Sequence, residues 1–225
     1  MRSYGRSISA GFVILFLAAF GAGCGSESSA PPTASIGTNS QSGGGGTAEE
    51  PPSKADLLHP IVVIETSLGE ITVKLDAEAA PGTVSNFLHY LNSSHYQQTI
   101  FHYVDKDMMI LGGGFTADGT PRPIGPPIRN EAHNGLKNKK GTIAMSRSFE
   151  DIDSATSQFF INVNDNPSLD YAGEDPDQYG YCVFGEVIDG MNVVEKIAAV
   201  GVHDSEAFTS TPIEPVVIRS MHVVR

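Results

Sequence analysis

The 225-residue sequence contains no tryptophan and only two cysteines, Cys24 and Cys182, which excludes a disulfide-rich scaffold. Basic residues are scarce as well, since 14 lysines and arginines face 26 aspartates and glutamates and the formal net charge is −12. Nucleic acids and anionic membrane surfaces are bound through clustered basic residues, so neither is an expected partner. The apolar fraction of 40% is that of an ordinary globular protein and excludes a fully disordered chain.

Long apolar runs are absent except near the N-terminus. There, Gly11–Phe20 follows two arginines; it is too short to span a membrane as a helix but is typical of a signal peptide. The next residues, Gly21-Ala22-Gly23-Cys24, resemble a bacterial lipobox, in which the cysteine is acylated. We predict a signal peptide over residues 1–23 and a lipoprotein anchored through Cys24, facing the periplasm or the cell exterior. A cleaved signal with a free cysteine is the alternative.

Residues 24–55 are rich in glycine, serine and proline and include Gly43-Gly44-Gly45-Gly46. Such a composition cannot bury enough apolar surface to order the chain, so it predicts a flexible linker. Residues 56–225 are then long enough to form one domain with its own core. Within that domain, Cys182 lies in an apolar run and is predicted to be a small buried hydrophobic residue.

Strand-forming runs dominate this domain. Ile61–Ile64 and Ile71–Leu75 flank a glycine-bearing turn and predict a hairpin. Two helices are predicted, one from Pro81 to about Asn92 and one over Met191–Val200. This pattern does not alternate as a doubly wound fold requires, so we predict a mainly β fold: a closed eight-stranded antiparallel barrel capped by two helices. The six other predicted strands are Thr99–Val104, Met108–Leu111, Thr142–Ser146, Gln158–Val163, Tyr181–Ile188 and Pro215–Val224.

Weaker patterns do not point to a cofactor. Gly112-Gly113-Gly114 is not followed by Lys-Ser/Thr, so we predict a tight barrel turn rather than a phosphate-binding loop. The histidines lack the spacing of a metal site, and we predict no metal. The acidic stretch 173–180 is either a solvated loop or a selector of ligand charge.

Six motifs follow one another along the domain: Ala80–Phe87, Phe101–Val104, Met109–Phe115, Gly141–Met145, Ser154–Ile161 and Val183–Val187. In this order they resemble the cyclophilin-type peptidyl-prolyl cis-trans isomerases, and Asn130-Glu131-Ala132 resembles the bacterial periplasmic branch. The resemblance implies the barrel predicted above, isomerisation of X-Pro bonds without a cofactor, and a monomer. It also implies that the partners are proline-containing peptides or unfolded exported proteins.

The resemblance further implies a site for this reaction. Rotation about an X-Pro bond meets a barrier of about 18–20 kcal/mol, which an apolar pocket, groups that hold the peptide backbone and an aimed donor can lower. Gln158 is implied to orient the substrate backbone, and Arg147 stands at the pocket rim. The proline pocket is implied to consist of Met108, Met109, Phe160, Leu169 and Tyr181.

Three positions depart from the family's pattern. Tyr103 stands at the position of the catalytic arginine, Leu111 at that of a glutamine, and Ser168 at that of an aromatic residue that helps to hold cyclosporin. Because a neutral phenol replaces a fork of cationic donors, we expect an isomerase of reduced activity with Tyr103 and Gln158 as catalytic residues. The alternative is a non-catalytic proline-peptide-binding or scaffold lipoprotein. Tyr103 is either a residual donor or a plain wall aromatic, and Arg147 either binds backbone or substitutes for the missing cation.

Overall fold

The structure is a computed structural model that describes residues 53–205 and 208–224. The predicted signal peptide, Cys24 and the linker up to residue 52 lie outside these residues. A short helix, α1 (Lys54–Leu58), spans the predicted domain boundary at residue 56. In this part of the chain, no helix is both long and apolar enough to cross a membrane.

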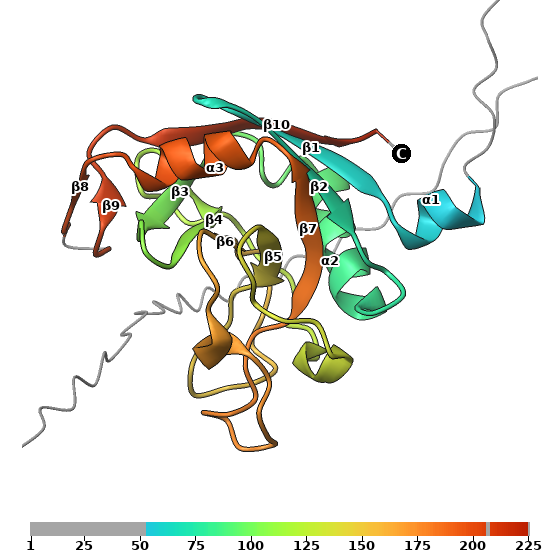
Figure 1. Cartoon of the computed structure of the whole chain (residues 1–225). Coiled ribbons are helices and arrows are strands. Elements are labelled where there is room, and N and C mark those ends of the chain that lie inside the picture. The colour runs from blue at the N-terminus through green and yellow to red at the C-terminus, as the bar shows by residue number, and fades with distance from the viewer. Residues whose placement is uncertain (1–52, 206–207, 225) are drawn as a thin grey trace, which may run out of the picture. The chain divides into compact units, whose positions relative to one another are not determined.

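Eight strands form a closed antiparallel barrel in the order β1-β10-β3-β4-β6-β5-β7-β2 (Figure 1). The predicted mainly β fold is confirmed, because each of the eight predicted strands overlaps one barrel strand. Closure pairs every barrel strand on both sides, so no barrel edge is left open. The strands are β1 (Ile61–Thr66), β2 (Gly69–Leu75), β3 (Thr99–Val104), β4 (Met109–Thr116), β5 (Thr142–Met145), β6 (Phe159–Asn162), β7 (Val183–Asp189) and β10 (Val216–Val223).

Both predicted helices are present as α2 (Pro81–Asn92) and α3 (Met191–Ala198), and each buries one apolar face. The N-terminus of α2 has no side-chain cap from Ala80. Instead, the Glu131 carboxylate accepts hydrogen bonds from the backbone N–H groups of Gly82 (3.1 Å) and Thr83 (2.8 Å). A negative group there also interacts favourably with the helix dipole, so a residue far along the chain stabilises the start of α2.

Aromatic rings fill much of the core inside the barrel. Phe87 of α2 lies 5.6 Å from Phe159 in an edge-to-face arrangement, and its ring is 5.2 Å from that of Phe184. All three side chains are fully buried. Edge-to-face aromatic pairs add about 0.5–1.5 kcal/mol beyond their area burial, so this cluster holds α2 against the barrel.

The prediction of a turn at Gly112-Gly113-Gly114 is wrong, because these glycines lie inside β4. Their lack of side chains allows a close approach of neighbouring groups. A Cβ on Gly112 would stand 2.9 Å from the Ile100 carbonyl oxygen, and one on Gly113, whose φ is +86°, would stand 2.9 Å from the Phe159 ring. The β3–β4 pairing shifts register twice beside them, as expected where a strand bulges.

Several short elements were not predicted. A two-stranded sheet forms from β8 (Val202–His203) and β9 (Thr211–Pro212), and two 3-10 turns, η1 (Ala132–Asn134) and η2 (Pro167–Leu169), lie in loops. Elements of two or three residues are too short to show a hydrophobic period, so the sequence pattern could not reveal them.

Candidate active site

A second apolar cluster lies apart from the main core, and strand alternation explains why. On β4, Ile110 belongs to the core, whereas Met109 and Leu111 belong to the second cluster. On β6, Ile161 belongs to the core and Phe160 to the second cluster. Successive side chains of a strand point to opposite faces, so the second cluster lies on the outer face of the barrel wall. Its buried members are Met109, Leu111, Ala144, Phe160 and Val183, and its partly buried members are Tyr103, Met108, Leu136, Leu169 and Tyr181.

The structure thus brings together all five residues predicted to form the proline pocket, and it places Tyr103 beside them. The Phe160 and Tyr181 rings meet edge to face, with centroids 5.7 Å apart. Ser168 is exposed on η2 next to the half-buried Leu169 and adds no ring to the site. Apolar walls with few polar groups are what a proline ring would require.

Sequence reasoning missed Ala144, Leu136 and Val183 as members of the cluster. Ala144 was detectable, because it alternates with the core residues Ile143 and Met145 along β5. Leu136 lies in a loop, where no periodicity indicates which way a side chain points.

Gln158 immediately precedes β6 and lies two residues before Phe160, so both side chains belong to the same face of the barrel wall. Its side chain lies over Gly114: a Cβ added to that glycine would stand 2.7 Å from Gln158 Cγ. The Gln158 amide forms no hydrogen bond with any described residue. It can therefore donate to and accept from a peptide backbone laid across the site.

Tyr103 is partly buried and packs against the cluster. Burial, aided by the negative charge of Asp105, raises the pKa of the Tyr103 phenol to about 12. The phenol is therefore protonated at neutral pH and is a neutral hydrogen-bond donor rather than a cation.

Arg147 is buried, with 3% of its surface exposed, and backbone carbonyls occupy its guanidinium. Nε donates to Gly180 O at 2.9 Å and Nη2 to Pro176 O at 2.9 Å. Nη1 donates to the carbonyls of Ser148 and Phe149. This geometry favours the backbone-binding interpretation over a substitute catalytic cation, because each guanidinium nitrogen donates to a backbone carbonyl, and two of the four carbonyls lie in the acidic stretch 173–180.

The same guanidinium also supports the wall of the site. Its central carbon lies 5.0 Å from the centroid of the Tyr181 ring, a cation–π distance. Asn130 Nδ2 shares the Gly180 carbonyl with Arg147, donating to it at 3.1 Å. Arg147 thus acts on the apolar cluster through Tyr181 and the loop before it, as a positioning residue.

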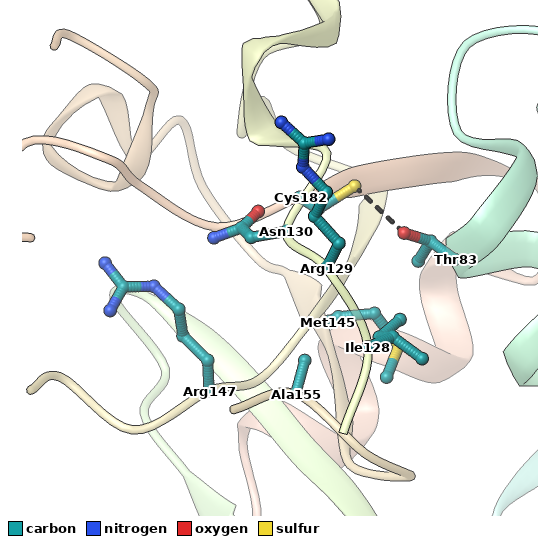
Figure 2. Close-up of a pocket in the computed structure, with 8 residues that line it drawn as sticks. All are labelled: Thr83, Ile128, Arg129, Asn130, Met145, Arg147, Ala155 and Cys182. Carbon is teal, nitrogen blue, oxygen red and sulfur yellow. Dashed lines mark hydrogen bonds between the residues drawn. The ribbon is translucent and has the colours of Figure 1, made fainter. Parts of the chain in front are cut away.

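A small cavity is lined by Thr83, Asn130, Arg147 and Cys182, among others (Figure 2). Figure 2 shows the Cys182 sulfur directed at the Thr83 hydroxyl, 3.4 Å away. Burial raises the pKa of the Cys182 thiol to about 12, so it is not a reactive thiolate. Cys182 is buried, as the sequence predicted. The described part of the chain contains no group of three His, Cys, Asp or Glu side chains that could hold a metal ion.

Comparisons with known proteins match this architecture. The profile of the family "Cyclophilin type peptidyl-prolyl cis-trans isomerase/CLD" matches residues 61–223. The chain is 46% identical over 164 residues to peptidyl-prolyl cis-trans isomerase A of Dickeya dadantii, covering 73% of this chain and 84% of the relative. It is 47% identical over 163 residues to peptidyl-prolyl cis-trans isomerase B of Escherichia coli, covering 72% of this chain and 99% of the relative.

Among solved structures, a cyclophilin-type isomerase of Cryptosporidium parvum superimposes with a TM-score of 0.60 at 24% sequence identity, covering 74% of this chain and 98% of that one. At this identity the likeness concerns the fold. The family profile spans most of the chain, and the bacterial relatives share nearly half of the aligned residues. The chain therefore belongs to the cyclophilin-type peptidyl-prolyl cis-trans isomerase family.

Proposed function

We propose that this chain isomerises X-Pro bonds, with the proline ring held on the outer-face cluster and with slow turnover. The observation that carries the proposal is the convergence of Met109, Phe160 and Tyr181 on one apolar surface beside the Gln158 amide, which has no hydrogen-bond partner among the described residues. A cyclophilin-type relative from Cryptosporidium parvum has been crystallised in the presence of the dipeptide Ala-Pro, which supports the choice of ligand.

Each of the site residues named below contributes in a different way to lowering the barrier to rotation about the X-Pro bond. Phe160 and Met109 exclude water from the proline ring, which favours the less polar twisted amide. The Gln158 amide fixes the flanking backbone so that rotation is confined to the X-Pro bond. The Tyr103 phenol donates a hydrogen bond to the twisted amide. A phenol offers one donor where a guanidinium offers five, and loss of a preorganised donor typically costs about 10²–10³ in rate, so turnover is slow.

A non-catalytic peptide-binding role is the second candidate, and the packing of Tyr103 against the apolar cluster favours it. The two candidates share the ground-state contacts and differ only in the barrier. Binding the substrate and the transition state equally well gives affinity without acceleration.

Nuclear magnetic resonance exchange spectroscopy on an Ala-Pro peptide, with and without the protein, separates the candidates. Faster cis/trans exchange that disappears in Phe160→Ala supports the isomerase. Binding without faster exchange supports the non-catalytic role, and absence of binding contradicts both.

We further propose that the protein is exported, anchored through lipid on Cys24, and assists the folding of exported proteins as a monomer. The support is the N-terminal sequence pattern together with the Gly/Ser/Pro-rich composition of residues 24–55. A linker of some thirty residues of this type has a root-mean-square reach of roughly 30 Å, which would leave the domain free to meet clients near the membrane.

A further inference from the structure

A groove of about 360 Å³ runs along β2, β5 and β7 and meets the outer-face cluster. Leu136 and Val183 belong to both: they line the groove and pack in the cluster. The groove is therefore continuous with the surface that the proposed function assigns to proline. An extended peptide advances about 3.3 Å per residue, so residues only a few positions from the proline would enter it.

The lining of the groove is more basic than the chain as a whole. It contains Lys74, Lys137 and Lys139 against Asp76 and Glu186, whereas the chain carries a net charge of −12. The lining therefore carries one more formal positive charge than negative charges on an otherwise acidic protein.

Several of these charges already have neighbours. Lys137 Nζ lies 3.8 Å from Asp170 Oδ2. Asp76 Oδ1 accepts the Ala79 N–H and lies 3.9 Å from His59 Nδ1.

The side chains of Lys74 and Lys139, unlike that of Lys137, have no such neighbour among the described residues. Neither side chain forms an ion pair or hydrogen bond within residues 53–205 and 208–224, although Glu186 is the register partner of Lys74 across β2 and β7. Two ammonium groups without partners in a groove that continues from the site would attract carboxylates by charge complementarity.

We propose that this groove, which we call the lysine groove, binds acidic residues flanking the substrate proline, so that the protein selects acidic proline-containing segments. This inference rests on the proposed function, because the acidic residues it selects are those that flank a proline held on the outer-face cluster. Lys74 and Lys139 act as specificity-determining residues.

Three peptides with one central Ala-Pro test the proposal on the full chain: a neutral peptide and two with three glutamates appended on the N-terminal or the C-terminal side. At low salt, one acidic peptide should bind about threefold to tenfold more tightly than the neutral one, as expected for one or two exposed ion pairs. The preference should shrink at high salt, because mobile ions screen exposed charges.

Lys74→Glu/Lys139→Glu should abolish or reverse this preference while leaving affinity for the neutral peptide unchanged. Arg219→Glu is the control for charge reversal at a single site: it makes half of the double variant's change in net charge, on β10, which stands opposite β5 in the strand order, and should leave the preference intact. Equal affinities of all three peptides, or a preference that survives in the double variant, would overturn the lysine groove.

Failure of the proposed function gives a different result, namely no binding of the neutral proline peptide. In that case an acidic peptide with alanine in place of proline still tests the groove. Wild-type protein should bind this peptide and the double variant should not. No binding by the wild type, or equal binding by the two proteins, rejects the lysine groove.

Discussion

Tyr103 of β3 and Leu111 of β4 are register partners in the antiparallel ladder. Both also belong to the outer-face cluster, so the two departures from the family's pattern contact the same patch of barrel wall. Side chains of paired residues on one face interact directly, which explains why the positions should be changed together. An arginine at position 103 would need a polar neighbour at 111 to orient its donors, and leucine cannot serve.

Tyr103→Arg with Leu111→Gln should therefore raise the isomerisation rate at least about tenfold, equivalent to roughly 1.4 kcal/mol of barrier. Peptide affinity should change little, because the new donors act mainly on the twisted amide. Exchange spectroscopy gives the rate, and titration gives the affinity. Tyr103→Arg alone should give a smaller gain. A double variant with wild-type rate, or a wild-type rate equal to that of the Escherichia coli relative assayed beside it, would show that Tyr103 is not limiting.

Stability should fall as the pH is lowered through the range in which His102 titrates. Burial lowers the pKa of His102 from 6.5 to about 4 in the folded protein. The unfolded chain binds this proton first, so the stabilisation is complete above about pH 6.5 and is lost as the pH falls towards 4. At 1.36 kcal/mol per pKa unit, the loss is about 3 kcal/mol.

Urea unfolding of the wild type and His102→Phe at several pH values measures this contribution. Phenylalanine suits the site because the His102 ring already packs against Phe115 and Phe208. Burial also lowers the pKa of His95, which acts in the same direction and is unchanged in the variant. Parallel stability curves for the two proteins would contradict the prediction.

Arg147→Ala should lower the free energy of unfolding by about 3 kcal/mol or more, because it removes hydrogen bonds to four buried or partly buried carbonyls. Peptide affinity should also fall, since Tyr181 loses its cationic support. Hydrogen exchange at the Tyr181 amide, which donates to Leu169 O, reports on this positioning and should become faster. Arg147→Lys keeps the charge and should recover part of the affinity. Full peptide affinity and activity in Arg147→Ala would contradict a positioning role for Arg147.

Cyclosporin should bind weakly, because Ser168 supplies no ring beside Leu169. Loss of an aromatic contact costs about 1–3 kcal/mol. Ser168→Trp should therefore tighten cyclosporin binding about tenfold or more in a calorimetric titration, with Ser168→Ala as the control. Nanomolar affinity for the wild type would refute this expectation.

Cys24→Ser should move the protein from the membrane fraction to the soluble fraction of the producing cell, because the acyl chains would be lost. Fractionation followed by mass spectrometry of the mature N-terminus is the measurement. Soluble wild-type protein with an unmodified N-terminus would refute the lipid anchor.

The barrel and most of the site were predictable because strand periodicity is a local property. Alternation along each strand separates Ile110 from Met109 and Phe159 from Phe160 whatever the rest of the chain does. The family resemblance then predicted which outward residues form a proline pocket, and the structure places those residues in one cluster. Burial of Cys182 also followed from its apolar run.

The sequence by itself determined the eight strands, the two capping helices and the residues offered to the outer face. Only the tertiary structure decided that the three glycines continue β4, since close approach of Phe101 and Phe159 is a contact between strands. It also decided the contacts of Arg147, whose hydrogen bond to Pro176 O joins residues 29 positions apart, and the meeting of Lys74 and Lys139 in one groove. Such contacts depend on how loops and separate strands come together in space, and no local pattern of residues encodes that.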